Sequence, residues 1–390
     1  MPQRRIPAVF MRGGTANAIV FHQKDLPTDR KWWDDIFLAA TGSPDPYGRQ
    51  LDGMGGGYTA VSKVCVIGPP TRDDADIDYT FAQIPIKEQR VEYAANCGNM
   101  SAAMGPFAVD ERLVQMPDAN GEALVRIHNT NTKKIIHARF PLVNGCAAVD
   151  GDLEIPGIAG SGAPVRLDFI SPGGAATGNL LPTGNVRDTL DVPGVGKIEV
   201  SMVDAANPCV FVRARDVGLK GSEPPAAVEA DAEVMRKFAA IRCTASVAMG
   251  ITRDIAEAAT RLSNPAIGYV SAPQDYTLSS GELLRADDID VTGRMIARGQ
   301  AHRDMPLTRT LCMAVASRIA GSIVHEATRI TNNPDAELRI GMPAGVITAA
   351  AEVRLIDGQW VAARGSFLRT QRRLFEGSVL VRGSHVAPAG

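Results

Sequence analysis

The stretch that decides the fold is Asn96–Val109, with the sequence NCGNMSAAMGPFAV. After its first four residues, it carries small and apolar side chains on all sides of a predicted helix. A helix that is apolar all round has no face for water and must be buried on every side. A second predicted helix, Pro306–Ile319, is also apolar and built largely of small residues, with Leu307, Leu311, Ala314, Val315 and Ile319 aligned. We therefore expect two buried helices.

Short strand patterns lie on both sides of each predicted buried helix. In the first half they are Ile6–Met11, Ala18–Phe21, Ser62–Ile67, Asp78–Gln83, Gln89–Tyr93, Leu124–Asn129, Ile135–Phe140, Val165–Phe169 and Lys197–Val203. In the second half they are Cys209–Val212, Ala266–Val270, Leu338–Ile340, Val346–Leu355 and Trp360–Phe367. Amphipathic helices are predicted over Asp29–Ala40 and Asp231–Ile241.

Each half thus has many strands around one buried helix, which is a repeat of architecture rather than of sequence. The pattern predicts an α+β protein with two similar domains, over 1–184 and 185–377, which meet in a glycine-rich stretch. We expect a C-terminal strand, 378–390, to join the first domain. The cleft between two such domains is the natural place for a ligand.

The composition is that of a globular protein and excludes several classes of function. The 390 residues include 41 lysines and arginines against 43 aspartates and glutamates, so no basic surface argues for nucleic acid. No apolar run reaches the roughly 18–20 residues of a membrane span, and the N-terminus is too short in apolar residues for a signal peptide. We expect a cytoplasmic protein, and its moderate charge is compatible with a homodimer.

The six cysteines follow no metal or disulfide pattern, because the nearest two, Cys65 and Cys97, are 32 residues apart. Cys97 nevertheless stands where a helix begins, and the positive end of a helix favours the thiolate form. Its neighbours Asn96, Gly98 and Asn99 let a ligand approach the backbone closely, as at an anion-binding helix terminus. The alternative is a buried structural thiol.

Lys63 interrupts the apolar strand pattern Val61–Ile67 and, by alternation, shares a face with Cys65. A lysine in an apolar setting loses proton affinity and becomes a usable base near neutral pH. The alternative is a solvated lysine on an edge strand.

Other familiar site patterns are missing from the sequence. It has no dinucleotide or phosphate-loop glycine pattern and no zinc-protease or hydrolase motif. His302, His128 and His137 lack partners at metal-ligand spacing and are interpreted as structural. The basic segment 369–373 suggests a carboxylate contact or a solvated face.

Several segments together resemble the PrpF family, the methylaconitate isomerases and their relatives that act on aconitate, methylitaconate and oxalomesaconate. The matching segments extend over nearly the whole chain. They are Met11–Thr15, Gly42–Gly48, Asp52–Gly56, Ser62-Lys63, Asn96–Asn99, Leu181–Gly184 and Arg372–Gly377.

The resemblance implies a diaminopimelate-epimerase-like fold, in which each of two domains wraps a β-barrel-like sheet around a central helix. It places the catalytic lysine at Lys63 and the active-site cysteine at Cys97, with no cofactor or metal. The substrate is then a small carboxylate whose double bond moves by a 1,3-proton shift. The residues expected to bind it are Arg12, Gly13, Gly14, Thr15, Asn17, Gly55, Gly56, Ser62, Asn96, Gly98, Asn99, Thr183, His302, Thr308, Arg309 and Met342.

The chain departs from the family pattern at three places. Family members usually have serine and lysine where this chain has Ala16 and Asn17, and many have GHPSG where it has GMPAG at 341–345. Arg309 stands where relatives tend to have a small residue. A changed substrate, with Arg309 or Arg12 binding a carboxylate, is favoured over drift outside the site.

Two other functions remain as alternatives. An epimerase on the same fold would use a cysteine at each central helix, but Cys209 and Cys312 do not repeat the setting of Cys97. A non-catalytic carboxylate-binding protein would have no need for both Lys63 and Cys97.

Overall fold

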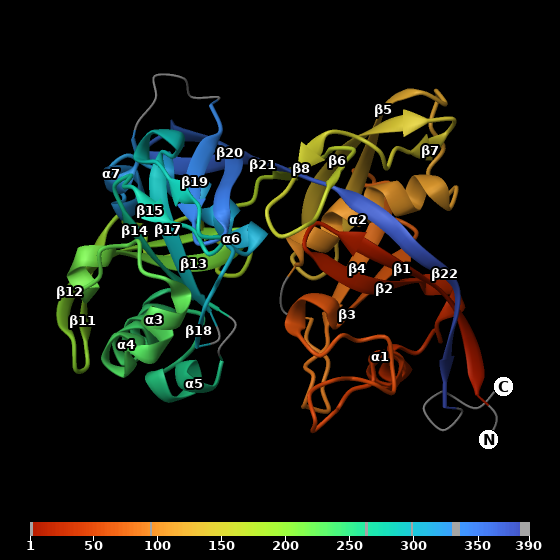
Figure 1. The fold of residues 1–390 in the computed structure, drawn as a ribbon, viewed down its shortest axis with the longest axis horizontal. Coiled ribbons are helices and arrows are strands. Elements are labelled where there is room, and N and C mark those ends of the chain that lie inside the picture. The colour runs from red at the N-terminus through yellow and green to blue at the C-terminus, as the bar shows by residue number, and fades with distance from the viewer. Residues whose placement is uncertain (1–2, 94–95, 262–263, 298, 330–335, 383–390) are drawn as a thin grey trace. The chain divides into compact units, whose positions relative to one another are not determined.

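The computed structural model describes residues 3–93, 96–261, 264–297, 299–329 and 336–382. The chain forms two compact units (Figure 1). The first consists of Met1–Leu167 and Leu368–Gly390, and the second is Asp168–Phe367. Both units combine strands and helices, so the α+β prediction is confirmed.

The sheet of the first unit begins at the last described strand of the chain. Its strands, in spatial order, are β22 (Gln371–Val381), β1 (Arg4–Gly13), β2 (Ala16–His22), β3 (Lys63–Gly68), β4 (Ile77–Gln83), β5 (Gly121–Asn129), β6 (Lys134–Val143) and β7 (Cys146–Ala147). Neighbours are antiparallel except for the pairs β2–β3 and β4–β5. A parallel pair needs a crossover connection, which α1 (Trp33–Thr41) and α2 (Gly98–Asp110) supply.

These two helices cover opposite faces of the sheet. Helix α1 packs on the side that carries Phe21, Val64 and Val66. Helix α2 contacts β1, β2, β3, β5, β6 and β7, and almost all of its residues are buried, as its apolar sequence predicts. Because side chains alternate along a strand, Lys63 and Cys65 of β3 point away from α1, to the α2 side.

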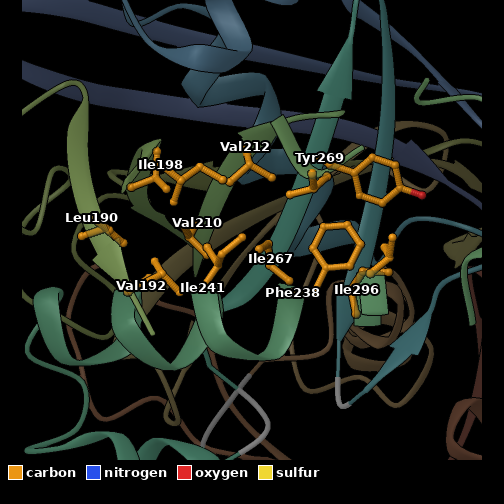
Figure 2. Packing of buried hydrophobic residues seen from close by; sticks show 14 of the residues in the cluster. Leu190, Val192, Ile198, Val210, Val212, Phe238, Ile241, Ile267, Tyr269 and Ile296 are labelled. Atoms are coloured by element: carbon orange, nitrogen blue, oxygen red, sulfur yellow. The ribbon is translucent and has the colours of Figure 1, made fainter. Parts of the chain in front are cut away.

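The second unit is built on a sheet of the same kind. Its strands, in spatial order, are β11 (Asp188–Val192), β12 (Gly196–Ala205), β13 (Asn207–Arg213), β14 (Ala266–Ser271), β17 (Val291–Ala297), β19 (Leu338–Met342), β20 (Gly345–Ile356) and β21 (Gln359–Arg369). Helix α4 (Ala232–Ala248) covers one face through Phe238 and Ile241, which pack on Val210, Ile267 and Tyr269 (Figure 2). Helix α6 (Leu307–Ser317) contacts β12, β13 and β20, and all of its residues except Arg309 are buried.

The order of strand pairings shows that the two units repeat one plan. From β1 to β6 the pairings run antiparallel, parallel, antiparallel, parallel, antiparallel. The same series runs from β12 through β13, β14, β17 and β19 to β20. Helix α2 therefore corresponds to α6, and α1 to α4. The two units thus repeat the same order of strands and helices.

The remaining described elements are short. They are β8 (Leu153–Glu154), β9 (Ser161–Gly162), β10 (Val165–Ile170), β15 (Tyr276–Thr277), β16 (Leu283–Leu284), β18 (Gln300–Ala301), α3 (Pro225–Ala230), α5 (Ile255–Thr260), α7 (Ile323–Ala327), and the 3-10 helices η1 (Gln23–Asp25), η2 (Arg30–Trp32), η3 (Thr59–Val61), η4 (Ala214–Val217) and η5 (Ala286–Asp288).

Three predicted elements differ from the observed ones. The strand expected over Gln89–Tyr93 is wrong: within it only Glu92 pairs, in an isolated bridge to Gln83. Residues 87–90 are all exposed, so no buried face fixes a register there. The first amphipathic helix begins at Trp33, because Asp29 instead caps η2 through the Lys31 amide. Helix α4 continues to Ala248, since its buried positions extend that far along the chain.

The unit boundaries lie at 167/168 and 367/368, whereas the sequence suggests 184 and 377. Strands β10 and β21 run across these positions, so the glycine-rich stretch does not mark the boundary. The expected C-terminal strand corresponds to β22, which begins at Gln371; residues 383–390 lie outside the described part of the chain.

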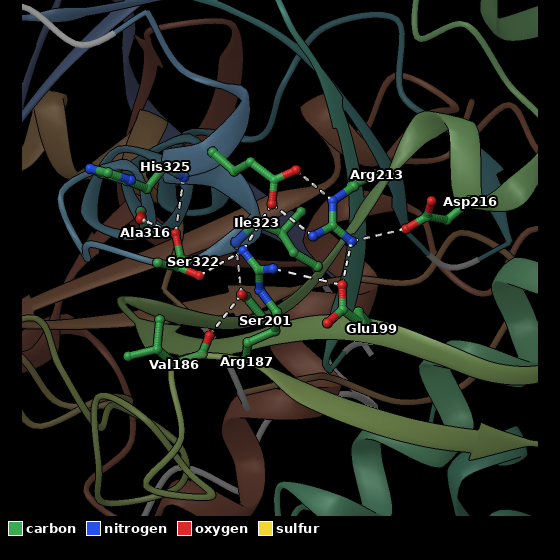
Figure 3. A network of polar contacts seen from close by, with 12 residues as sticks. Val186, Arg187, Glu199, Ser201, Arg213, Asp216, Ala316, Ser322, Ile323 and His325 are labelled. Carbon is green, nitrogen blue, oxygen red and sulfur yellow. Dashed lines mark hydrogen bonds and ion pairs between the residues drawn. The ribbon is translucent and has the colours of Figure 1, made fainter.

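An arginine-carboxylate network fastens α7 to the sheet of the second unit (Figure 3). The Arg213 Nε and Nη2 groups donate to the two carboxylate oxygens of Glu326 at 2.9 and 2.7 Å. Arg187 Nη2 donates to the same carboxylate at 2.9 Å, and Arg213 also bonds Glu199 and Asp216. The hydrogen bond from Arg213 is the main reason that the pKa of Glu326 is lowered to about 2.

We expect Glu326→Gln to lower the free energy of unfolding at pH 7 by about 1 kcal/mol, discounted because the carboxylate is partly exposed to solvent. The lowered pKa means that the ionised carboxylate stabilises the fold above its ordinary value of 4.5. This stabilisation is lost as the pH falls from 4.5 toward 2, and the variant should lack that part of the pH dependence. Urea unfolding between pH 2 and 7 measures both effects. Glu122→Gln, at an exposed pair 3.6 Å from Arg139, is the control and should change little.

Candidate active site

Cys97 is the N-terminal cap of helix α2. Cys97 has extended backbone geometry, and its carbonyl accepts the first helical hydrogen bond from the Ser101 amide at 2.9 Å. Its side chain is partly exposed, and Gly98 follows as the first helical residue. No acidic side chain of the helix itself lies in its first turn, where the positive end of the helix dipole favours an anionic ligand.

Asn96 adds a hydrogen-bond donor beside this helix start. Its side chain is buried, and its Oδ1 accepts from Ser101 Oγ and Asn129 Nδ2, both at 3.3 Å. Its Nδ2 is buried and has no hydrogen-bond partner among the residues that the structure describes. Since a buried unpaired donor is costly, an acceptor on a ligand is the natural partner for it.

The turn between β1 and β2 lies against the first turn of α2. Asn99 Nδ2 donates to Thr15 Oγ1 at 3.0 Å. A Cβ atom on Gly13 would lie 2.5 Å from the Asn99 carbonyl oxygen, and Gly14 has φ of 50°, so both positions require glycine. Arg369, which sequence analysis noted only within a basic segment, donates from Nε to Asn99 Oδ1 at 3.2 Å. The predicted Gly13–Thr15 and Asn96–Asn99 groups are thus brought together.

Lys63 is the first residue of β3 and is buried, with 7% of its surface exposed. Its Nζ donates to the Thr59 carbonyl oxygen at 2.7 Å and to Gln83 Oε1 at 2.5 Å. It also lies 5.6 Å from the ring centroid of Phe81. The alternative of a solvated edge-strand lysine is therefore wrong, because β3 is paired on both sides and the amine is held inside.

Two further acidic groups lie beside these residues. Burial raises the pKa of the Cys65 thiol; Cys97 raises it further, while the hydrogen bond with Tyr79 and the charge of Lys63 lower it. Burial likewise raises the pKa of Tyr79, with added effects from Cys65 and Cys97, and its hydroxyl lies 3.8 Å from Cys65 Sγ. Cys65 and Tyr79 therefore stay protonated at neutral pH. Lys63 and Cys97 both affect the pKa of the Cys65 thiol, and helix α2, which Cys97 caps, contacts β3.

Ser62 and the loop that contains Gly55 and Gly56 come just before β3 in the chain. Ser62 is fully buried, donates to the Ile84 carbonyl at 2.8 Å and accepts from Gln50 Nε2 at 2.7 Å. Gly55 lies against the side chain of Gln50, and Gly56 lies against Val61. These three predicted binding residues therefore pack the loop, and the Ser62 hydroxyl is already engaged.

Arg12 is also engaged within the protein. Its Nη1 donates to the Gly14 carbonyl at 3.0 Å and to the carbonyl and hydroxyl oxygens of Thr370 at 3.2 and 2.9 Å. Burial and, after it, the nearby Arg372 guanidinium lower the pKa of Arg12. Asn17, half-buried, lies opposite Arg12 in the β1–β2 register.

The second unit carries the other predicted binding residues, most of them near the start of α6. Thr308 is buried and accepts a hydrogen bond from Asn207 Nδ2 at 2.6 Å, much as Thr15 accepts one from Asn99 in the first unit. Met342 is buried, and its sulfur accepts from the Met305 amide at 3.3 Å. Arg309 is half-buried in the first turn of α6.

Two predicted binding residues have partners within their own segments. The backbone amide of His302 donates to the Met295 carbonyl at 2.9 Å. Thr183 Oγ1 donates to Asp188 Oδ2 at 2.7 Å, just before β11.

The second unit does not repeat the lysine and cysteine of the first. The residue that caps α6 is Pro306, where α2 has Cys97. Cys312 lies further along the helix, fully buried, with its Sγ bonded to the Val203 carbonyl at 3.3 Å. Strand β14, the counterpart of β3, begins with Ala266 and Ile267. An epimerase with a thiol at each central helix would thus lack its second thiol.

The described residues contain neither a cluster suited to a metal ion nor a helix suited to a membrane. Among the described residues, no three histidine, cysteine, aspartate or glutamate side chains gather as a metal site would require. In the same part of the chain, no helix is both long and apolar enough to span a membrane.

Comparison with known proteins defines a class, an isomerase with the diaminopimelate-epimerase-like fold. A crystal structure of methylitaconate-delta-isomerase superposes with a TM-score of 0.87 at 41% identity, covering 100% of this chain and 98% of that one. A family model described as PrpF protein matches residues 3–382, and the chain belongs to the PrpF family.

Characterised relatives agree with this membership over nearly their whole length. The 3-methylitaconate isomerase of Eubacterium barkeri is 42% identical, over 97% of this chain and 98% of its own. The 2-methyl-aconitate isomerase of Cupriavidus necator is 36% identical, over 98% of both chains. The family resemblance seen in the sequence is therefore confirmed.

Proposed function

We propose that this protein moves a carbon–carbon double bond by a 1,3-proton shift in an unsaturated di- or tricarboxylate, of the aconitate, methylaconitate, methylitaconate or oxalomesaconate type. The observation that carries the proposal is a buried amine, Lys63, held by two neutral oxygen acceptors in the neighbourhood of the Cys97 thiol. The activities named for the relatives support the same class of substrate.

In this proposal Lys63 is the base. Burial disfavours the ammonium form of a lysine. The neutral amine removes a proton from a carbon next to, or conjugated with, a carboxylate. Cys97, or the protonated Lys63, then returns a proton to the far end of the allyl system.

The negative charge that develops between these two steps needs positive potential. The amides of Gly98 and Asn99 at the start of α2 and the Nδ2 donor of Asn96 supply it from fixed positions. Because these groups are already oriented by the helix and by buried hydrogen bonds, they need no reorganisation as the charge appears.

The residues that differ from the family pattern favour a substrate with a different carboxylate arrangement. Arg12 and Arg309 are the two candidates for a new carboxylate contact. Arg12 bonds Gly14 and Thr370 through Nη1, and Arg309 lies in the first turn of α6. A bidentate guanidinium contact suits either.

Proton NMR in D₂O with cis- and trans-aconitate, 2-methylaconitate, methylitaconate and oxalomesaconate tests the proposal. We expect deuterium at an allylic carbon together with a shifted double bond for at least one acid. Exchange without bond migration would indicate an epimerase-like reaction instead. No reaction with any of the five acids, from a folded protein, would contradict the proposed substrate class.

A further inference from the structure

Asn129, the last residue of β5, has a fully buried side chain that contacts Asn96. Its Nδ2 donates to Asn96 Oδ1 at 3.3 Å and to the Tyr79 carbonyl at 3.4 Å. Its Oδ1 accepts from the Thr132 amide at 3.0 Å and from the Thr132 hydroxyl at 2.8 Å. The sequence pattern places Asn129 only at the end of a predicted strand, and it gives no sign of a contact with a residue 33 positions away.

The orientation of the Asn129 amide follows from two backbone groups that each have a single role. The Thr132 amide can only donate and the Tyr79 carbonyl can only accept, so Oδ1 must face Thr132 and Nδ2 must face Tyr79. The atom of Asn96 that meets Asn129 Nδ2 must then be an acceptor, which is its Oδ1. The nitrogen of Asn96 is therefore the atom that does not meet Asn129.

The turn that follows Asn129 is anchored to β4. Thr130 donates from its amide to the Tyr79 carbonyl at 2.9 Å. The Asn131 side chain pairs with the backbone of Phe81, because it accepts from the Phe81 amide at 2.8 Å and donates to the Phe81 carbonyl at 2.9 Å. The Asn129 side chain thus leaves a backbone that is held on its C-terminal side by two consecutive residues.

The consequence for Asn96 is a donor that is buried and available. Asn96 is 7% exposed, and its Oδ1 also accepts from the Ser101 hydroxyl at 3.3 Å. Its Nδ2 has no hydrogen-bond partner among the residues that the structure describes. Turning the Asn96 amide over would set its nitrogen against the Asn129 nitrogen, and two donors cannot satisfy each other. Asn129 therefore keeps the Asn96 nitrogen unpaired, one residue before the cap of α2.

We propose that Asn129 is a positioning residue of this site: its amide fixes the orientation of Asn96, so that Asn96 Nδ2 is held as a donor for the substrate. The inference rests on the proposed function, in which this donor meets the negative charge that develops on the substrate. Asn129 acts through Asn96 and has no contact of its own with the substrate.

Asn129→Leu tests the proposal, because leucine has a similar branched shape but no donor, so that Asn96 is free to turn over. Loss of one preorganised donor to a developing charge lowers kcat by about 10²–10³-fold. We therefore expect kcat to fall by roughly 10²-fold in Asn129→Leu and in Asn96→Ala, with KM changing less. The double variant should be no slower than Asn96→Ala, since residues that act as one unit are not additive.

Thr130→Val is the matched control. It removes a hydroxyl of the same turn, which lies 2.7 Å from the Thr80 hydroxyl, and leaves the contact between Asn129 and Asn96 in place. We expect the control to lose stability in thermal unfolding and to keep the wild-type kcat. The proposal is overturned by a folded Asn129→Leu with wild-type kcat, by an equal loss of kcat in the control, or by losses that multiply in the double variant.

Asn129→Ser is the second variant, for use if Asn129→Leu does not fold. A serine hydroxyl can accept from the Thr132 amide and so preserve the turn, but it is too short to reach Asn96. We expect kcat to fall by roughly tenfold or more. An unchanged kcat in this variant would contradict the role of Asn129.

Binding of unreactive acids gives a readout that needs no turnover. Tricarballylate and 2,3-dimethylsuccinate are the saturated counterparts of aconitate and methylitaconate, and isothermal titration calorimetry measures their Kd. Because a hydrogen bond to a charged group is stronger than one between neutral groups, we expect Asn96→Ala and Asn129→Leu each to raise Kd by roughly tenfold.

The two readouts together separate the inference from the proposed function. If the wild type turns over none of the acids but binds an analogue, and both variants weaken that binding, the proposed function fails and the role of Asn129 stands. If the wild type is active and Asn129→Leu matches it in kcat and Kd, the proposed function stands and the inference fails. A wild type that neither reacts nor binds would contradict both.

Discussion

Lys63→Ala should abolish double-bond migration, with kcat/KM lowered by roughly 10³-fold or more, because a positioned general base contributes about 10²–10⁴-fold. The loss should appear in both deuterium uptake and bond migration, since the base acts in the first step. Both are read from the same NMR spectra in D₂O.

Lys63→Arg tests whether Lys63 acts as a base or supplies only a positive charge. A guanidinium keeps the charge but cannot release its proton in this pH range, so this variant should be as inactive as Lys63→Ala. Lys87→Ala, which removes an exposed lysine of the same unit, is the matched control and should keep wild-type activity. An active Lys63→Arg would show that Lys63 supplies charge rather than a proton acceptor, and would contradict the proposed role.

The fold could be predicted because it follows from burial. A helix as apolar as Asn96–Val109 is expected to be buried on every side. The strand patterns on both sides of it in the sequence therefore predict a sheet that packs against it. The same reasoning found the second buried helix, α6, and hence the repeat. The pattern over Gln89–Tyr93 failed because propensity alone does not make a strand where charged residues leave no buried face.

Those features of the candidate site that depend on residues adjacent in the sequence could be predicted. The position of Cys97 at a helix start and the alternation that pairs Lys63 with Cys65 both depend on adjacent residues. The partners of these groups come from elsewhere: Gln83 lies opposite Lys63 through sheet register, and Arg369 reaches Asn99 from the far end of the chain. No periodicity in a single sequence specifies such contacts.

The unpaired Nδ2 of Asn96 belongs to the same group of features that only coordinates reveal. Its oxygen accepts hydrogen bonds from Ser101 and Asn129, and its nitrogen has no hydrogen-bond partner among the described residues. Under the proposed function, this amide is a donor for the negative charge that develops on the substrate.

Cys97→Ala should separate the two halves of the proton shift. If Lys63 removes the proton and Cys97 returns one at the far carbon, the variant still exchanges deuterium at the first carbon. Migration of the double bond should fall by roughly 10²-fold or more, because the proton donor is gone. Deuterium in recovered substrate and the amount of isomerised product, measured in one NMR time course, give the two rates.

Cys97→Ser and Cys146→Ala complete this experiment. A serine hydroxyl is a much weaker acid than a thiol, so Cys97→Ser should resemble the alanine variant even though it keeps a polar group at the helix cap. Cys146 is exposed and lies in β7, and its replacement should leave both rates unchanged. Full migration in Cys97→Ala would assign the proton return to Lys63, so that one amine serves both ends of the allyl system and Cys97 contributes only to the shape of the helix start.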